Sequence, residues 1–377
     1  MLLIDRYILG RFLANFVILF SLLFVFAIAI DLILNLDDFV EATRNAKGED
    51  ANIFVFLATL IGYILDFQAP KFFQFYLYLH GLIAIGAMAF TLAQMHRFKE
   101  LVAVLASGVS MQRIAMPFVA GTFVLSLVQL LNQELILPRV APLLLRDHDE
   151  IGKSGLGEFE VPFTSDGHGT LLLAPSYNPD TLTLTSPTFI EREDRRTTSK
   201  RILADKAVWD TSRRGWRLEG GQAIIAVDLN ETQSDEVVQR ETIDFYASEI
   251  SPELLTVRRY AQFAGMLSLA QIREMLSTPG ATDDSTRTLT RYRFSRFSSV
   301  LVNILVMVLT LPCFLLREPS NLMRQSVICA SLAVPFMFGA ALGMMADIPG
   351  FSPVAGVFLP IFILVPIALA RVTMMKT

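Results

Sequence analysis

Six apolar stretches alternate with polar segments along this 377-residue chain. Each is free of Asp, Glu, Lys and Arg, and each reaches or approaches the roughly 20 residues that an α-helix needs to cross a hydrocarbon core about 30 Å thick. They cover residues 12–30, 72–95, 114–133, 297–316, 325–346 and 348–370. The pattern predicts an α-helical membrane protein with six transmembrane helices, divided into two halves by a long, mostly polar segment.

A seventh apolar run, residues 51–65, does not fit this series. It is short for a crossing, and Asp66, Gln68, Pro70 and Lys71 close it. Counting it as a crossing would also reverse the side of every later loop and break their shared charge pattern. We therefore interpret residues 51–66 as an external interfacial helix.

The central polar segment carries the signals of β-structure. Short runs of β-branched and aromatic residues are separated by turn residues such as Gly220 and Gly221. The predicted strands are residues 170–174, 181–185, 201–209, 215–218, 222–229 and 237–246. Such short strands predict an all-β sandwich or jellyroll-like domain. After it, Ser268 as N-cap and Gln271 as its capping-box partner predict a connecting helix that stops at Pro279 and Gly280.

Composition narrows the functional classes. Hydrophobic residues make up 53% of the chain and charged residues 18%, as expected of a membrane protein. The net charge of -4 does not suggest nucleic acid as a partner. Cys313 and Cys329 both lie in apolar spans, so they predict no disulfide framework.

The short loops indicate the orientation, because Lys and Arg near membrane spans are retained on the cytoplasmic side. One set of loops and termini carries many cations and few carboxylates. Its cations are Arg6, Arg11, Arg97, Lys99, Arg113, Arg317, Arg324, Arg371 and Lys376. The opposite loop, residues 31–71, has three cations against seven carboxylates. We expect both termini in the cytoplasm and the central domain outside.

The loop between the second and third spans has helical periodicity. Leu101, Val104, Leu105 and Gly108 fall at helical spacing, with Glu100 near the start. We predict an amphipathic cytoplasmic helix over residues 96–110. A short surface helix that merely joins two spans would give the same periodicity.

At these residues the chain resembles a known family, the LptF/LptG permeases of the lipopolysaccharide-export ABC transporter. The resemblance rests on the start at residues 4–8 (Ile-Asp-Arg-Tyr-Ile), on Glu100-Leu101-Val102 followed by Ala106-Ser107-Gly108, and on a third span running into Pro138. It covers nearly the whole chain. It implies helices 1–3 within residues 1–137, a periplasmic β-jellyroll within 138–265, and a connecting helix with helices 4–6 within 266–377. The start leans toward the G type without deciding between the two types.

The resemblance implies a non-enzymatic permease subunit of the bacterial inner membrane. Its implied partners are a second permease of the same family, a cytoplasmic ATPase dimer that binds the ATP, a bitopic jellyroll membrane protein and a soluble periplasmic bridge. Lipopolysaccharide is the implied cargo, and this chain holds no cofactor or metal. Gly152-Lys153-Ser154 looks like the end of a phosphate-binding loop, but Asp147 stands where that loop needs its first Gly.

The resemblance also assigns roles to particular residues. The loop helix looks like the coupling helix that docks in a groove of the ATPase, with Glu100 facing a basic residue there. The coupling residues are Arg97, Glu100, Leu101, Leu105 and Gly108. The candidates for binding lipid phosphates are Arg139, Arg146, Arg293 and Arg296. For any one of these arginines, pairing with Asp147, Asp149 or lipid headgroups is the more ordinary explanation.

In the family the first and fifth spans flank a lateral gate for lipid. The gate candidates are Phe20, Phe24, Asp31 and Pro335. Family members often carry cations near the outer end of the first span, whereas this chain has Asp31, Asp37 and Asp38 there. A partner subunit, a bridging divalent cation or a different substrate could compensate, and we favour the partner. Ordinary packing in the membrane also explains the phenylalanines and the proline.

Two other functional classes remain open from the sequence. A membrane scaffold or mechanotransmission protein with a periplasmic sensory domain would share this layout. A secondary transporter would need ionisable residues deep in the spans. Apart from polar residues such as His80 and Asn303, the spans offer almost none.

Overall fold

The computed structural model describes residues 3–48, 52–144, 158–165, 170–194, 197–227, 237–248, 250–252, 255, 264–277, 283–315, 322–346 and 351–373. The chain forms two compact units. The first consists of Met1–Leu144, Gly265–Leu269 and Arg287–Thr377, and the second of Leu145–Ala264 and Ala270–Thr286. The expected central domain, residues 138–265, thus begins later than expected, because residues 138–144 belong to the helical unit.

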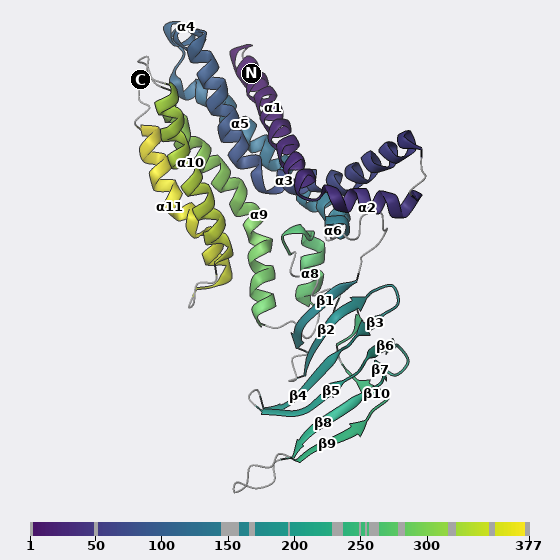
Figure 1. Ribbon diagram of the computed structural model, residues 1–377. Helices are drawn as coiled ribbons and strands as arrows, with labels where there is room; N and C mark the ends of the chain where they lie inside the picture. Colours follow the sequence, from purple (N-terminus) through teal and green to yellow (C-terminus); the bar gives the residue numbers. More distant parts are fainter. Residues whose placement is uncertain are drawn as a thin grey trace. The chain divides into compact units, whose positions relative to one another are not determined.

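Six helical segments among the described residues are long and apolar enough to cross a membrane, which confirms the predicted fold class (Figure 1). The first two are α1 (Leu3–Leu34) and α3 (Ile53–Arg97). The third is α5 (Met111–Leu131), which continues through the π-helical turn η1 (Asn132–Ile136) into α6 (Leu137–Leu144). The others are α9 (Asp283–Thr310) with the 3₁₀ turn η4 (Leu311–Cys313), α10 (Leu322–Met345) and α11 (Pro353–Thr373).

These helices bury one face together and leave another exposed. Phe12 of α1, Met88 of α3 and Phe118 of α5 are fully buried in one cluster. Val25 and other large apolar side chains are more than half exposed on the outside of the bundle. Lipid tails are as apolar as these side chains, so an exposed apolar surface is what a membrane bundle presents to its solvent.

The segment predicted as a separate interfacial helix is part of α3. This helix runs for 45 residues from Ile53 to Arg97 and contains Pro70, so the prediction that a helix ends at residue 66 is wrong. A proline removes one backbone hydrogen bond, which bends a helix or ends it. Here α2 (Leu36–Lys47) packs against α3 just before Pro70, where Phe39 meets Phe67 with ring centroids 5.7 Å apart, and the helix continues. In Figure 1 this part of α3 and α2 lie together to one side of the bundle.

The helix between the second and third spans is shorter than the predicted 96–110. α3 ends at Arg97, Lys99 adopts a left-handed backbone conformation with φ of 58°, and α4 spans Glu100–Ala106. Gly108 follows with φ of 85°, a conformation that glycine adopts without steric cost.

The described residues of the second unit form a ten-stranded antiparallel sheet. Nine strands follow the order β10-β7-β6-β3-β2-β4-β5-β8-β9, and β1 pairs with β2 outside this path. The strands are β1 (Phe159–Ser165), β2 (Leu171–Asn178), β3 (Thr183–Thr185), β4 (Thr188–Asp194), β5 (Thr197–Leu203), β6 (Lys206–Asp210), β7 (Gly215–Glu219), β8 (Gln222–Val227), β9 (Val237–Thr242) and β10 (Phe245–Ala247). Strands β3 and β4 pair with opposite ends of β2, so the sheet divides into two wings. The wings share one core, in which the rings of Phe189 and Tyr246 lie 4.7 Å apart.

The strand predictions miss several details. The strand predicted over residues 201–209 is wrong, because β5 ends at Leu203 and β6 begins at Lys206. The strand predicted over 237–246 is interrupted between β9 and β10. Strands β1 and β4 were not predicted. Each interruption holds an aspartate, Asp205 or Asp244, a residue that favours turns over strands.

Candidate functional site

The carboxylate of Glu100, at the start of α4, is held by side chains of the first span. Its Oε2 accepts a hydrogen bond from Nη1 of Arg11 at 2.6 Å, which makes an ion pair, and another from the hydroxyl of Tyr7 at 3.2 Å. Arg11 also donates from Nη1 to the Tyr7 hydroxyl at 2.7 Å and from Nε to Oε1 of Gln94 at 3.2 Å. Charge-assisted hydrogen bonds of this kind are short and directional. They connect α4 to α1 and to the end of α3.

The same carboxylate remains within reach of a partner. The side chains of Arg11 and Glu100 are 21% and 32% exposed. Next to Glu100, Leu101 is fully buried in the helical core and fixes α4 to the bundle. Of the other predicted coupling residues, Leu105 is half-buried, whereas Arg97 and Gly108 are exposed.

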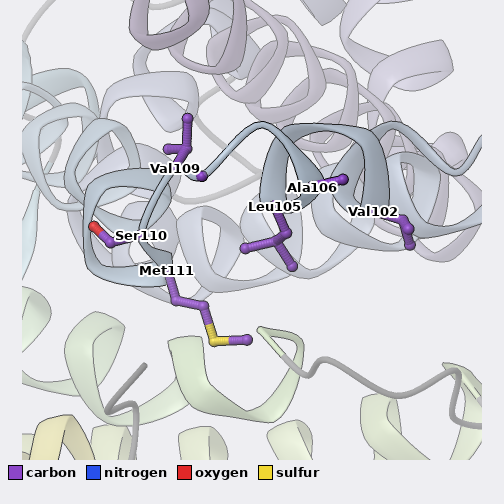
Figure 2. Close-up of a pocket in the computed structure, with 7 residues that line it drawn as sticks. Val102, Leu105, Ala106, Val109, Ser110 and Met111 are labelled. Carbon is purple, nitrogen blue, oxygen red and sulfur yellow. The ribbon is translucent and has the colours of Figure 1, made fainter.

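A hollow of about 430 Å³ opens beside α4 (Figure 2). Two predicted coupling residues, Leu105 and Gly108, belong to its lining. The remaining lining residues are Val102, Ala106, Val109, Ser110 and Met111. Val102 is 55% exposed, so the apolar lining of the hollow continues onto the exposed surface of α4. The structure thus separates the predicted residues into an ion pair, a buried anchor and an open apolar surface.

His96 links the same end of the molecule to the fourth span. Its Nε2 lies 2.7 Å from the backbone oxygen of Phe314, just after η4. A carbonyl oxygen can only accept, so Nε2 carries the proton and donates it. The chain entering α4 is therefore joined to the first span through Glu100 and to the fourth through His96.

The predicted lipid phosphate residues are not gathered in one site. Arg296 is buried, donates from Nη1 to Oε2 of Glu134 at 2.8 Å, and also donates from Nη2 to the backbone oxygen of Leu267. Glu134 in turn accepts the first backbone N–H of α8 (Leu269–Ser277), from Leu269 at 3.0 Å. Arg296 therefore joins η1, α9 and the segment before α8, and its guanidinium is engaged by protein groups.

The other three candidates have different surroundings. Arg139 is exposed, and Arg293 is half-buried with its guanidinium 5.7 Å from the ring centre of Phe294. Arg146 lies outside the described residues. Arg139 and Arg293 are therefore the members of the predicted set that the structure leaves accessible.

At the end of the first span that is remote from α4, Asp31 has a cation partner within the chain. Oδ2 of Asp31 accepts hydrogen bonds from Nζ of Lys71 at 3.0 Å and from Nε2 of Gln68 at 2.5 Å. The Lys71 ammonium also lies 4.3 Å from the ring centre of Phe67. Asp37 is exposed, and the cation expected from a partner subunit stays a prediction.

The gate candidates lie in separate environments. Phe20 is buried and Phe24 half-buried, and both pack against Phe72 of α3 with ring centroids 5.1 Å apart. Pro335 is exposed within α10, which continues through it. The aromatic residues serve the packing of the first two spans.

Several residues at these ends were missed from the sequence. Tyr7 and Arg11 lie one helical turn apart, so their shared face was visible. Their meeting with Glu100, 89 positions beyond Arg11, was not. Val102 had a weaker signal, as an apolar residue on a short helix that the bundle does not fully cover.

Comparison with curated protein sequences finds no match. The family model described as lipopolysaccharide export system permease LptF/LptG matches residues 6–374, which is nearly the whole chain. Six membrane-spanning helices and an inserted β-domain agree with the layout expected of such a permease. The chain therefore belongs to the LptF/LptG family of permeases of the lipopolysaccharide export system.

Proposed function

We propose that this protein is a permease subunit of an ABC transporter. It would extract lipopolysaccharide, or a related glycolipid, from the outer leaflet of the inner membrane and pass it to a periplasmic jellyroll bridge. Family membership supports a role in lipopolysaccharide export in general. The observation that carries the finer proposal is the exposed apolar surface of α4, joined to the first span by the pair between Glu100 and Arg11.

The position of α4 supports docking of a protein rather than of lipid. The helix lies beyond charged residues such as Arg11 and Arg97, at an end of the bundle where the hydrocarbon core has ended. Val102 and Phe98 are nevertheless more than half exposed there, beside the apolar hollow. Exposed apolar surface in an aqueous region marks an interaction site. In this proposal a cytoplasmic ATPase dimer covers it, and ATP is bound and hydrolysed by that partner.

The Glu100 carboxylate would pass movement of α4 into the bundle. One oxygen engages Arg11 and Tyr7 of α1, and the partial exposure leaves the group open to a basic side chain of the ATPase. The hydrogen bond from His96 to Phe314 gives a second connection, to the fourth span. Displacement of α4 would therefore act on helices of both halves of the permease.

The lipid side of the proposal rests on fewer contacts. Arg139 and Arg293 are the accessible candidates for lipid phosphates. In the β-domain, β9 and β10 end the sheet path and offer strand edges to the jellyrolls of the bitopic partner and the soluble bridge. A second permease subunit would complete the membrane channel.

Co-purification tests the docking step. The affinity-tagged chain is expressed with the ATPase and the second permease of the same bacterium, extracted in detergent and assayed for bound ATPase. We expect Val102→Glu to lower ATPase recovery about tenfold or more, because it places a charge in an apolar interface. Ala103→Glu is the matched control, since Ala103 is exposed on the same helix but does not line the hollow.

Two results would contradict the proposal. Equal recovery of the ATPase with Val102→Glu and with the unmodified chain would show that α4 is not the docking surface. Failure of the unmodified chain to recover any nucleotide-hydrolysing subunit would favour the membrane scaffold with a periplasmic sensory domain.

A further inference from the structure

A two-helix platform, formed by α2 and residues 53–66 of α3, lies at the end of the first span that is remote from α4. Arg11 pairs with Glu100 at the end of this span that lies next to α4. Asp31 pairs with Lys71 at the other end. In Figure 1 the platform extends to the side of the bundle instead of continuing along it.

The two ion pairs are spaced like the two surfaces of a bilayer. Arg11 and Asp31 are about 20 residues apart on one helix, which corresponds to roughly 30 Å, the thickness of the hydrocarbon core. α3 returns across the same distance between Lys71 and Gln94. The 45 residues of α3 amount to roughly 67 Å of helix, so its first turns cannot lie within the same crossing. Residues 53–66 therefore lie beyond the point of α3 at which the hydrocarbon core ends.

The platform has an apolar face directed away from α2. Ile53, Leu57, Ile61 and Leu65 follow one another at four-residue intervals, so they form one row along α3. These side chains are between 46% and 65% exposed. α2 packs against α3 just beyond this row, where the fully buried Phe39 meets Phe67.

Most charges of the platform lie on α2, and Asp66 follows the apolar row on α3. Asp37, Glu41 and Arg44 of α2 are exposed, and α2 carries two acidic residues in its first turn. Charged side chains favour water, whereas an exposed apolar row is attracted to the boundary of the acyl chains. The two faces therefore fit a surface that is apolar on one side and aqueous on the other.

We propose that this platform lies on the bilayer, with the row Ile53, Leu57, Ile61 and Leu65 inserted among phospholipids and α2 facing the water. The row continues the surface of a helix that itself crosses the membrane, so lipid already covers the adjoining part of α3. Asp31, Lys71 and Gln68 hold the platform to the first span at the point where it leaves the bilayer. The platform thereby fixes the depth of α1 and α3 relative to that leaflet.

Fluorescence quenching in liposomes tests this arrangement. The full-length chain with Cys313→Ala and Cys329→Ala, which removes two buried free thiols, receives a single cysteine at Leu57 or at Glu41 and an environment-sensitive fluorophore. It is reconstituted in phosphatidylcholine and phosphatidylglycerol vesicles containing a phospholipid with a nitroxide near the top of its acyl chain. We expect the nitroxide to quench the label at position 57 severalfold more strongly than the label at 41, and aqueous iodide to show the reverse preference.

The same measurement can overturn the proposal in two ways. Equal access of iodide to positions 57 and 41 would show that the apolar row faces water. Protection of position 57 from both quenchers would show that protein, such as a second copy of the chain, covers the row in place of lipid. A label at Ile61 should repeat the result at Leu57, since the two lie on the same face.

Discussion

The two ends of the first span are each fixed by one ion pair, but the pairs join different kinds of structure. At one end the base, Arg11, belongs to the span and the acid, Glu100, begins a seven-residue helix. At the other end the acid, Asp31, belongs to the span and the base, Lys71, lies within a 45-residue helix. The exposures of the two pairs are similar, so the difference lies in what each pair holds.

In the proposed function, the pair between Arg11 and Glu100 passes movement of α4 to the first span, whereas the pair between Asp31 and Lys71 acts as an anchor that holds two long helices together. A helix of seven residues has too few backbone hydrogen bonds to be stable alone, so α4 depends on Leu101 and on the Glu100 contact for its position. Lys71 sits in a long helix that Gln68 and the packing of Phe39 on Phe67 also hold. Loss of the first pair should free α4 from the first span, whereas loss of the second should change little.

The pair between Arg296 and Glu134 should show the largest effect on stability. The Arg296 side chain is 2% exposed and the Glu134 side chain 34% exposed, so water reaches the carboxylate that Arg296→Ala leaves behind. We expect a loss of stability above the about 1 kcal/mol of exposed pairs and below the about 3–5 kcal/mol of fully buried ones, measured by thermal unfolding in detergent. Arg293→Ala, three residues earlier and half-buried, is the matched control and should change stability less. Equal effects of the two substitutions would mean that burial of the guanidinium does not set the loss of stability.

Lys71→Met tests the anchor. The Lys71 side chain is 31% exposed, and such partly exposed pairs contribute about 1 kcal/mol or less. We expect a small decrease in thermal stability and lipopolysaccharide release close to that of the unmodified protein. If Lys71→Met lowered lipopolysaccharide release as strongly as Arg11→Gln, the distinction between the two ends of the first span would be contradicted.

Tyr7→Phe should have the smallest effect. It removes one hydroxyl, which donates to Glu100 at 3.2 Å and accepts from Arg11 at 2.7 Å, and leaves the ion pair between Arg11 and Glu100 in place. The expected change in stability is about 1 kcal/mol or less, with ATPase recovery unchanged. A loss of ATPase recovery as large as that expected for Val102→Glu would instead place Tyr7 in the docking surface.

The apolar pattern predicts the six spans because their length is set by the bilayer and needs no tertiary information. The same pattern misplaces the end of the helix at Asp66 and Pro70, since the packing of α2 on α3 and the pairing of Lys71 with Asp31 keep this helix continuous. In the β-domain, β1 escapes prediction because Pro162 lies within it, and β4 because charged residues fill its second half.

The site shows the same limit. The periodicity around Leu101 predicts a short helix with one apolar side, and the structure buries Leu101 on that side. Arg296 could not be distinguished from Arg293 by sequence, because its partner Glu134 is 162 residues away. Long-range pairing therefore decides which arginines are structural and which remain accessible.

The most direct test of the account is Arg11→Gln in a reconstituted complex with the ATPase and the second permease. Recovery of the ATPase and ATP-driven release of lipopolysaccharide are measured on the same preparation. We predict normal recovery of the ATPase, because the α4 surface is intact, together with a strong loss of release, because α4 is no longer held to the first span. Release equal to that of the unmodified protein would contradict the claim that the pair between Arg11 and Glu100 transmits movement from α4 into the membrane.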